Sequence, residues 1–499
     1  MKTITLILVL ILINEFCSLG QSPNFPFPNH TLYAASHIKP NNYSQAELDN
    51  HTHLFYDEWK QEYLKNDCGN TNEYYVLSGN GAKTVSEAHG YGMMITAYFA
   101  GYDANAQTYF DGLYIYYKAH PSNINNSLMD WQQITCNDAP SSDDDAASDG
   151  DIDIAFSLLL AHAQWGSNGT VNYLGEAINL INAIMQDEIN QTTWTVKLGD
   201  WCDASDPSYF YGTRPSDFIT DHFRSFSFAT NNTNWNNVID TCYSLIENMQ
   251  TNYSTTTGLI PDFIINANTT PSPAVANYLE NIYDGDYYYN ACRVPWRLGT
   301  DYLLNGDLRA KTAINKINTW LILTSGSNVN NISNGYYLNG TAIYNWNNAT
   351  FVGPLTVAAM LNISNQTWLN SLYENLFSNN DLIDGDYYSN TIKLLSMIVI
   401  SGNYWSPDND ILTSEQSFSN SIDVIVYPTI ANESVIIKIQ NEENIENKHF
   451  RITDENGKIL IDDTIQNDIV DISFLDSGAY FITIIFKDKG MTTKKIVKK

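Results

Sequence analysis

The stretch "ASDGDIDIAFSLLLAHAQW", residues 147–165, places three aspartates at alternate positions directly before a long apolar run. A calcium loop of the EF-hand type needs Gly at its sixth position and Glu at its twelfth, where this stretch has Ile and Leu, so that kind of metal site is excluded. A helix fits better, because Ser148 or Asp149 can cap it and the apolar residues recur at helical spacing. We therefore predict a buried helix from about residue 150, with Asp151 and Asp153 serving its first turn and its packing.

The same helical periodicity recurs between residues 44 and 405, with little strand signal. Its first helix opens with a capping box, Ser44 and Glu47. Further helix starts are predicted near residues 86, 105, 150, 173, 215, 234, 293, 308, 349, 366 and 387. About twelve helices of similar length, without the sequence repeat of a solenoid, predict an all-α closed barrel of paired helices whose long loops gather at one end as the site.

Different patterns flank this helical region. Residues 1–21 carry Lys2, an apolar run and small residues near 18–20, which is the layout of a secretory signal peptide, and the run is shorter than the roughly 20 residues that span a bilayer. Residues 406–420 are polar and turn-rich, and residues 421–499 contain short β-branched runs such as "IDVIVYP". We therefore predict a signal peptide (1–21), a large helical domain (22–405), a linker (406–420) and a small all-β domain (421–499).

Composition narrows the class of partner. The 499 residues include 25 basic and 55 acidic ones, which gives a formal charge of −30. Such a field repels nucleic acid and anionic lipid, and it attracts a cationic ligand if part of it lines a cleft; it also serves solubility outside the cell. The five cysteines beyond the predicted signal peptide are widely spaced, without CxxC or HxxxH, so we expect no zinc site and no dense disulfide framework, while one or two bridges stay open.

The motifs of nucleotide binding and of common nucleophiles are absent: there is no GxxxxGK[ST], GxGxxG after a strand, GxSxG or HExxH. Several segments instead combine carboxylates with aromatic rings, including "SEAHGYGM" (86–93), "GDWCDASDPSYFYGTRPSDF" (199–218) and "YLENIYDGDYYYNACRVPWR" (278–297). Aromatic rings suit the apolar CH faces of sugars, and cleavage of a glycosidic bond needs two carboxyl groups, one protonated and one ionised. The inventory favours a glycosidase that uses no cofactor and no metal.

The stretch 147–165 resembles the signature of glycoside hydrolase family 8 along its length, and "SEAHGYGM" is similar to the segment that carries the family's general acid. The resemblance covers about residues 35–405 and implies an (α/α)6 barrel and an inverting hydrolase of β-1,4-linked glucans, mixed-linkage β-glucans, xylans or chitosan. Residues 421–499, with "VYPTI" and "LDSGAYFITIIFKDKGMTTKKIVKK", resemble the C-terminal sorting domain of the type IX secretion system. That second resemblance implies a secreted or cell-surface protein handled by the secretion machinery; a sugar-binding β-sandwich is the alternative for this domain.

The family resemblance makes Glu87 the general acid and brings Asp149 into the site. By its position alone, Glu87 is a carboxylate that stabilises the positive end of a helix dipole. As an acid it needs burial or a neighbouring negative charge to keep its proton near neutral pH. Asp149 is then expected to grip and distort the sugar beside the broken bond and to raise the pKa of Glu87.

The general base departs from the usual family pattern. Many members have an Asp where this chain has Asn290, and an amide cannot accept the proton of the attacking water. A subset rich in chitosanases and lichenases takes its base from a Glu of the preceding loop, and here Glu280 is the one Glu between residues 270 and 290. We therefore predict Glu280 as the base, with Asp284 as the second candidate and Asp286 as a further substitute; the alternative is that Glu280 is a solvated loop residue.

The remaining site residues follow from the same resemblance. Trp131 and Trp201 are expected to stack on sugar rings, although packing in the core is the ordinary role of tryptophan. Tyr289, Asn290 and Arg293 are assigned to substrate binding, and Asn290 and Arg293 are expected to hold the base, the water or the sugar.

Three further positions, Asp145, Arg214 and Asp217, have either a structural role or a role in substrate binding. One of the acidic residues 143–145, assigned as Asp145, is predicted to face a sugar subsite, where a carboxylate would pair with the ammonium group of glucosamine. Glucanase or lichenase activity and chitosanase activity are therefore ranked equal. Arg214 is interpreted as structural, at the start of a helix, whereas Asp217 either caps that helix or contacts substrate.

A different class of function stays open. The same barrel fits a catalytically silent glycan-binding or adhesin-like surface protein, and Asn290 is its main support. In either case we expect a monomer that binds a polysaccharide and no nucleic acid.

Overall fold

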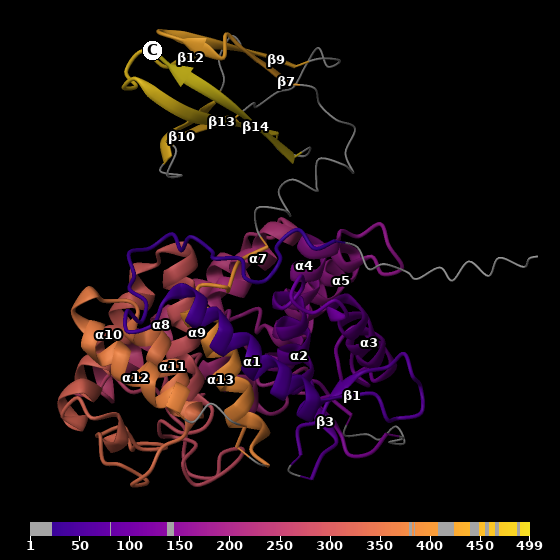
Figure 1. Cartoon of the computed structure of the whole chain (residues 1–499), viewed down its shortest axis with the longest axis vertical. Helices are drawn as coiled ribbons and strands as arrows, with labels where there is room; N and C mark the ends of the chain where they lie inside the picture. The colour runs from indigo at the N-terminus through magenta and orange to yellow at the C-terminus, as the bar shows by residue number, and fades with distance from the viewer. Residues whose placement is uncertain are drawn as a thin grey trace, which may run out of the picture. The chain divides into compact units, whose positions relative to one another are not determined.

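The computed structural model describes residues 22–79, 81–136, 144–378, 382–383, 385–407, 424–439, 449–454, 459–464, 469–486 and 490–499. The chain divides into two compact units, Met1–Pro407 and Asp408–Lys499 (Figure 1). The predicted signal peptide, Asp143 and residues 408–420 of the predicted linker lie outside the described residues. None of the helices in the described ranges is long and apolar enough to cross a membrane.

Twelve helices of at least eleven residues build the described part of the first unit, as the sequence predicts. A four-residue helix, α6, and three pairs of two-residue strands lie in the loops between them. The helices are α1 (Gln45–Tyr63), α2 (Ser86–Tyr98), α3 (Ala106–Ala119), α4 (Ser148–Trp165), α5 (Tyr173–Ala183), α6 (Pro207–Phe210), α7 (Thr220–Thr230), α8 (Asn234–Asn252), α9 (Val294–Asn305), α10 (Leu308–Ser325), α11 (Ala349–Ala359), α12 (Gln366–Ser378) and α13 (Tyr387–Ile400). The paired strands are β1 (Leu64–Lys65) with β2 (Tyr75–Val76), β3 (Thr84–Val85) with β4 (Gln132–Gln133), and β5 (Ile264–Ile265) with β6 (Ser272–Pro273).

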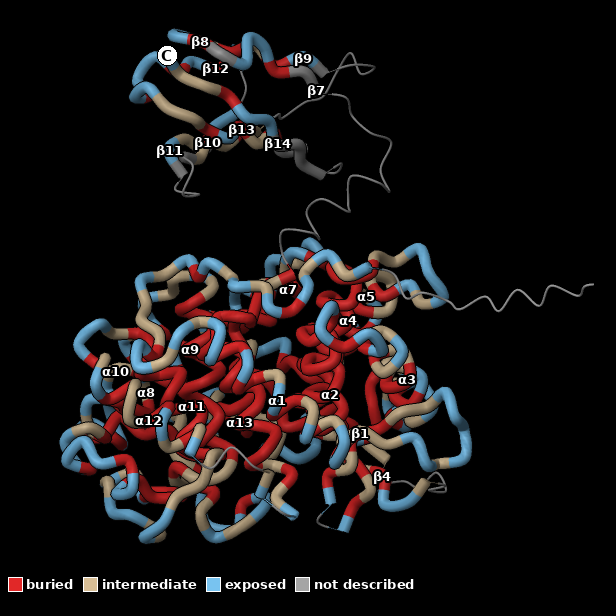
Figure 2. The backbone as a smooth tube through the Cα atoms, in the orientation of Figure 1, coloured by how far each residue is buried: buried red, intermediate tan, exposed pale blue. Residues whose placement is uncertain are grey.

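Every second long helix belongs to an inner ring. Contacts run from α2 through α4, α7, α9 and α11 to α13, and from α13 back to α2, which closes the ring. The other six long helices pack around it: α3, α8 and α12, for example, bury one face each, whereas every residue of α4 is buried. A helix that is apolar around its whole circumference belongs inside a layer of other helices, and Figure 2 shows buried chain along α2, α4 and α13. The first unit is therefore the predicted (α/α)6 barrel.

The ends of the helices follow local capping rules in part. The capping box of α1 is present, since Ser44 Oγ accepts the N–H of Glu47 and the Glu47 carboxylate accepts the N–H of Ser44. The predicted cap of α4 is wrong, because its N-cap is Ala147 and no side chain caps it. Ser148 Oγ donates instead to a backbone carbonyl of the loop after α5, and Asp149, inside the helix, accepts the N–H of the next residue, Gly150 (3.0 Å).

Two predicted helices begin later than expected. The helix predicted near residue 215 begins at Thr220 as α7, because Pro215–Asp217 form a separate 3₁₀ turn. That turn is held by the Asp217 carboxylate, which accepts hydrogen bonds from Arg214 and Ser216. The helix predicted near residue 293 begins one residue later as α9, after another 3₁₀ turn.

Residues 24–38 form a strap across the C-terminal ends of inner helices. The last carbonyls of a helix have no partner within the helix. The strap supplies five of these partners, since carbonyls at or just after the ends of α4, α2, α13, α9 and α11 accept the backbone N–H groups of Asn24, Phe27, Thr31, Ala35 and Ile38, respectively.

The second unit consists of two antiparallel-rich sheets in its described residues. The five-stranded sheet has the order β11-β10-β13-β14-β8 and the three-stranded sheet the order β12-β9-β7. Inward β-branched side chains such as Val435, Ile452 and Ile482 fill its core. The strands are β7 (Val424–Tyr427), β8 (Ile430–Ala431), β9 (Ser434–Ile439), β10 (His449–Asp454), β11 (Ile459–Thr464), β12 (Ile469–Asp471), β13 (Gly478–Phe486) and β14 (Gly490–Lys498). The predicted small all-β domain is thus present.

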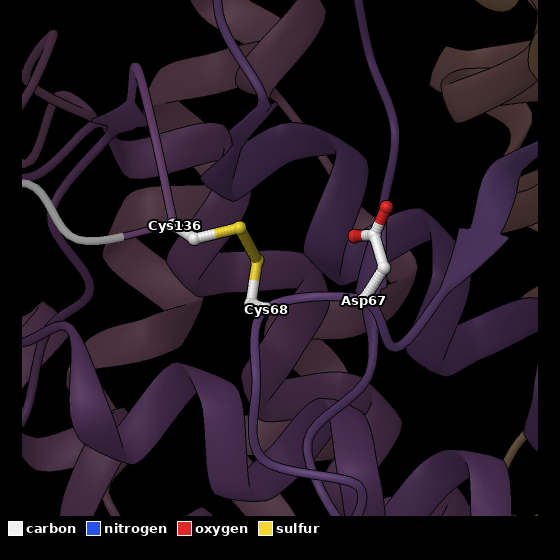
Figure 3. A group of neighbouring side chains, drawn as sticks. All are labelled: Asp67, Cys68 and Cys136. Atoms are coloured by element: carbon white, nitrogen blue, oxygen red, sulfur yellow. A yellow bond between two sulfur atoms is a disulfide. The ribbon is translucent and has the colours of Figure 1, made fainter.

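One disulfide ties two loops of the barrel together. Cys68 bonds to Cys136, and Figure 3 shows the Asp67 carboxylate beside the pair. Sequence spacing did not single out this pair. Among the described cysteines, Cys202 and two others are free and buried. Because the two sulfur atoms are bonded to each other, the group of Asp67, Cys68 and Cys136 offers no thiolate to a metal ion.

Candidate active site

A cleft of about 590 Å³ lies at the N-terminal ends of the inner helices. Each of the six supplies a lining residue from its first turn or from the loop before it, so the long loops gather at one end as predicted. In Figure 1, β3, which leads directly into α2, lies at the lower end of the first unit. Helix N-terminal ends carry partial positive charge, and six of them around one cleft favour carboxylates there. The described lining residues are Val85, Ser86, Glu87, Trp131, Ala147, Asp149, Arg214, Glu280, Tyr289, Asn290, Trp346, Asn348, Ile383, Asp386 and Tyr388.

Two glycines bring Glu87 and Asp149 together. A Cβ on Gly90 of α2 would lie 2.6 Å from the Asp153 Cβ of α4, and a Cβ on Gly150 would lie 2.5 Å from the Ser86 Cβ. Neither position can therefore hold a larger residue without a shift of the helices, and the first turns of α2 and α4 lie in close contact. This contact places the second residue of each helix, Glu87 and Asp149, at the same part of the cleft.

Arg293 links these two carboxylates. Its Nη1 donates to Glu87 Oε2, to Asp149 Oδ2 (3.1 Å) and to the Tyr91 hydroxyl (3.1 Å). The guanidinium is 1% exposed, and the Glu87 and Asp149 side chains are 18% and 4% exposed. A buried cation that contacts two carboxylates holds both side chains in place and offsets the cost of burying their charge.

The same surroundings move the pKa values of the two acids apart. Burial raises the pKa of Glu87 to about 7; Arg293 opposes this rise and the charge of Asp149 adds to it. Burial also acts on Asp149, but Arg214 and Arg293 outweigh it and lower its pKa to about 2. Near neutral pH, Glu87 therefore carries a proton in a large fraction of molecules, whereas Asp149 is ionised.

Asn290 connects Arg293 to Glu280. Arg293 Nη2 donates to Asn290 Oδ1 (2.9 Å), and Asn290 Nδ2 donates to Glu280 Oε2 (2.8 Å). The guanidinium and the amide thus stand one after the other between the Glu87 and Glu280 carboxyl groups. A carboxylate in place of Asn290 would have no N–H for Glu280 and would repel it, so the amide suits its position.

Asp262 fixes this arrangement from behind, and we did not predict it from the sequence. Its buried carboxylate accepts the backbone N–H groups of Tyr288 (2.9 Å), Asn290 (3.2 Å) and Ala291 (2.7 Å). Burial raises its pKa to about 8. A single Asp in "IPDF" carries no pattern, because the groups it holds lie almost thirty residues further along the chain.

Asp284, the second candidate for the base, lies under the loop that carries Glu280. It is fully buried, and its oxygens accept the N–H groups of Leu279 (2.7 Å), Glu280 (3.0 Å) and Asn281 (2.9 Å). Of the two, Glu280 lines the cleft, with a side chain that is 40% exposed, and Asp284 does not. Asp284 therefore positions the loop, whereas Glu280 is available to water.

Arg214 contradicts its interpretation as a purely structural residue. It lines the cleft, with Nη2 3.4 Å from Asp149 Oδ1 and Nη1 3.8 Å from Glu280 Oε1. Its Nε donates to Asp217 Oδ2 (3.0 Å), and Asp217 is fully buried and absent from the described lining. Asp217 thus holds Arg214 and the 3₁₀ turn, and neither caps α7 nor faces the cleft.

Of the six residues assigned to substrate binding, three line the cleft, namely Trp131, Tyr289 and Asn290, whereas Trp201, Arg293 and Asp145 are absent from its described lining. Trp131 lines the cleft and is 40% exposed. Its backbone is held between Ser86, which donates its N–H to the Trp131 carbonyl (2.9 Å), and the carbonyl of Asp145, which accepts the Trp131 N–H (2.8 Å). Asp145 therefore supports the cleft through its backbone. Trp201 packs edge-on against Tyr209, with ring centroids 5.2 Å apart, in a separate apolar cluster.

One wall of the cleft was not predicted. Trp346 and Asn348 precede α11, and Ile383, Asp386 and Tyr388 lie before or at the start of α13. The Tyr388 hydroxyl donates to the carbonyl of the predicted residue Tyr289 (2.8 Å). Their signal in the sequence is position alone: each lies next to a predicted helix start, and in a closed double ring the starts of the inner helices meet at one end.

The other two aspartates of the opening stretch lie in the core. Asp153 pairs with Arg297 and with His222 (3.1 Å), and Asp151 accepts the N–H of Met129 (2.9 Å). Both are fully buried and absent from the described lining of the cleft. Of the three aspartates, Asp149 alone faces the cleft, as expected.

Comparison with known proteins identifies the family of each unit. The model of the glycosyl hydrolases family 8 matches residues 28–402, and that of the secretion system C-terminal sorting domain matches residues 425–499. A β-glucanase of Niallia circulans is 48% identical over 385 residues, which is 77% of this chain and 92% of the relative. An endoglucanase of Bacillus sp. (strain KSM-330) is 40% identical, over 77% of this chain and 82% of the relative.

A solved structure extends the likeness to the fold. The apo β-1,3-1,4-glucanase from Paenibacillus sp. X4 is 48% identical to this chain, with a TM-score of 0.73, and covers 77% of this chain and 100% of its own. The sorting domain makes the protein a secreted or cell-surface one. With the barrel, the acidic cleft and these matches together, the chain belongs to glycosyl hydrolase family 8 and ends in a type IX secretion sorting domain.

Proposed function

We propose that this family 8 protein is an inverting endo-β-glucanase that hydrolyses β-1,4 linkages, with Glu87 as general acid and Glu280 as general base. The observation that carries the proposal is the row Glu87, Arg293, Asn290, Glu280, which sets two carboxyl groups apart on one cleft. An inverting hydrolase needs its carboxyl groups about 6.5–9.5 Å apart, so that a water molecule fits beside the sugar. Two groups in direct contact would leave no such room.

Glu87 donates its proton to the glycosidic oxygen as the bond breaks. A pKa of about 7 lets it hold the proton near neutral pH and release it readily. Asp149, ionised beside it, accepts hydrogen bonds from the hydroxyl groups of the sugar and stabilises the positive charge that develops on the ring. Arg293 keeps both side chains in position throughout.

Glu280 accepts a proton from the water that attacks the opposite face of the sugar. Its side chain is exposed enough for water to reach, and Asn290 and Arg214 orient it. Asn290 therefore acts as a positioning residue, which accounts for an amide at a place where many relatives carry an acid. Trp131 and Tyr289, which line the cleft, are proposed to contact sugar rings along the chain.

The substrate proposed is a neutral β-glucan, with mixed 1,3-1,4 linkages or continuous 1,4 linkages. The names of the relatives support this choice. Chitosan is predicted from an acidic run facing a subsite and from Asn290, but Asp145 is absent from the described lining of the cleft, and Asn290 fits a glucanase equally well. We propose further that the protein is a monomer, that residues 1–21 are a signal peptide, and that residues 22–405 and 421–499 act as the catalytic and sorting domains.

Activity of the wild type, Glu87→Gln and Glu280→Gln on barley β-glucan, carboxymethylcellulose and chitosan tests the proposal. The wild type is expected to cleave the glucans, and each variant to lose at least about 10²-fold in kcat. NMR of the first product should show the α-anomer at the new reducing end. A β-anomer would contradict inversion, and a wild type that binds the glucans without cleaving them would favour the silent glycan-binding protein.

A further inference from the structure

The loop between α10 and α11 differs in charge from the rest of the protein. Residues 317–373 contain no Asp, Glu, Lys, Arg or His, in a chain whose formal charge is −30. Within this segment, residues 333–348 read "SNGYYLNGTAIYNWNN", so aromatic rings alternate with amides and hydroxyls. Uncharged hydrogen-bonding groups beside flat rings suit a neutral sugar. They offer no ionic partner to a cationic one.

Five aromatic rings from this loop and from the loop before α9 form a continuous row, which we call the aromatic track. Trp346 and Tyr337, at its two ends, are 47% and 41% exposed. The hydroxyl groups of Tyr288 and Tyr344 lie 3.0 Å apart at its middle. Neighbouring ring centroids are separated by 5.4 Å (Trp346–Tyr344), 6.3 Å (Tyr344–Tyr288), 4.8 Å (Tyr288–Tyr283) and 6.0 Å (Tyr283–Tyr337).

A backbone bridge explains why these rings share one face. Tyr287 and Tyr336 exchange backbone hydrogen bonds of 3.0 and 2.9 Å, and both side chains are buried. Because side chains alternate between the faces of extended chain, Tyr288 and Tyr337 point to the opposite side. Gly335 leaves room there, since a Cβ at that position would lie 2.8 Å from the Tyr288 ring.

The aromatic track begins at the cleft and is fixed in shape. Trp346 lines the cleft, and its carbonyl accepts the backbone N–H of Asn334 (2.9 Å). Asn334 Nδ2 donates in turn to the hydroxyl of Tyr289, another lining residue (3.0 Å). Further out, the N–H of Tyr337 donates to the Thr341 carbonyl (2.9 Å). A preformed surface loses little conformational entropy on binding a polymer.

We propose that the aromatic track binds a neutral β-glucan chain beyond the cleft and so makes the enzyme prefer long, uncharged polymers to short oligosaccharides. This inference rests on the proposed function, because it assumes that the cleft holds a glucan. The carboxyl group of Asp286, in the loop that carries Tyr283 and Tyr288, accepts the backbone N–H of Leu338 (3.2 Å). A sugar chain bound along the aromatic track would therefore contact aromatic rings and amide groups, and not ionic groups.

The test uses the double variant Tyr283→Ala/Tyr337→Ala, at the end of the track farther from Trp346 in the row. The ratio of kcat/KM on barley β-glucan to kcat/KM on a mixed-linkage tetrasaccharide is expected to fall about five- to tenfold, mainly through KM on the polymer. In a Glu87→Gln background, retardation of the full-length protein by β-glucan in affinity electrophoresis should weaken by a similar factor. Tyr253→Ala, at a tyrosine that is 39% exposed outside the track, is the matched control and should change neither quantity. Tyr337→Phe keeps the ring and should behave as the wild type.

The outcomes separate this inference from the proposed function. An enzyme that cleaves β-glucan with an unchanged ratio and unchanged retardation in the double variant would overturn the aromatic track and leave the function intact. A wild type that does not cleave β-glucan, while the double variant loses retardation, would overturn the function and leave the track. Equal loss in Tyr337→Phe, or retardation of the wild type by chitosan as strong as by β-glucan, would also contradict a track for neutral sugars.

Discussion

Replacing Asp149 with asparagine removes one negative charge from the cleft and keeps the shape of the side chain. The charge of Asp149 helps to raise the pKa of Glu87 to about 7, and both carboxylates share Nη1 of Arg293. Asp149→Asn also leaves Arg293 with Glu87 as its carboxylate partner at Nη1, which acts in the same direction. The pKa of Glu87 is therefore expected to fall.

The size of the fall follows from the contact that the two carboxylates share. Two unit charges about 6 Å apart at an effective dielectric constant of ~20 interact by about 2.8 kcal/mol, which corresponds to ~2 pKa units and is an upper bound for groups near a cleft. We therefore expect the pKa of Glu87 to fall by about 1–2 units. A general acid works in its protonated form, so activity falls as pH rises through its pKa.

The assay is the pH profile of kcat/KM on soluble β-glucan between pH 4 and 9. The decline on the alkaline side should lie near pH 7 in the wild type and about 1–2 units lower in Asp149→Asn, with an activity at pH 7 roughly 5- to 50-fold lower for this reason alone. Asp386→Asn, which removes a carboxylate from the other wall of the cleft, is the control and should leave the decline in place. A decline that stays near pH 7 in Asp149→Asn, or moves upward, would refute the coupling of the two acids.

Four further variants test the loop that carries Glu280, the disulfide and the buried carboxyl group of Glu188. Glu280→Gln should lower kcat by at least about 10²-fold, whereas Asp284→Asn should mainly lower the melting temperature; equal losses of kcat in two well-folded variants would contradict these roles. Cys68→Ser/Cys136→Ser opens a bridge between residues 68 positions apart and should lower the free energy of unfolding by up to about 4 kcal/mol, measured in urea; a change below about 1 kcal/mol would contradict a stabilising bridge. Burial raises the pKa of Glu188 well above its usual range, so the folded protein loses stability as pH rises above the unfolded pKa of about 4.3. Glu188→Gln should therefore gain more stability at pH 8 than at pH 5, and equal effects at both would show that the carboxyl group is not kept protonated.

The fold could be predicted because its signals are local. Helical periodicity locates each long helix, and the capping box of Ser44 and Glu47 marks one start. The pairing of Glu87 with Asp149 came from motifs whose small residues, Gly90 and Gly150, are the ones that allow two helices to meet. Features that depend on a short segment of sequence could therefore be predicted from the sequence alone.

The rest depends on contacts between distant parts of the chain. Arg214 faces the cleft because Pro215–Asp217 form a separate turn before α7, and the propensity for a helix after proline pointed the other way. Trp346 and Asp386 reach the cleft because the ring of inner helices closes, and no local sequence pattern predicts that closure. Asp145 was predicted to bind substrate because of its charge. In the structure its backbone carbonyl supports Trp131 by accepting the Trp131 N–H.

The strap of residues 24–38 sets the moment at which the barrel can close during synthesis. Asn403 Oδ1 accepts the backbone N–H groups of Asn29 and His30, which lie 374 and 373 positions earlier in the chain. At roughly 5–20 residues per second, about 20–75 s pass between the appearance of one partner and that of the other. During that interval the backbone N–H groups of Asn29, His30 and Thr31 lack their partners at residues 402 and 403, and the ring of inner helices is incomplete. The strap therefore cannot make its last contacts, and the ring cannot close, until almost the whole catalytic unit has been synthesised.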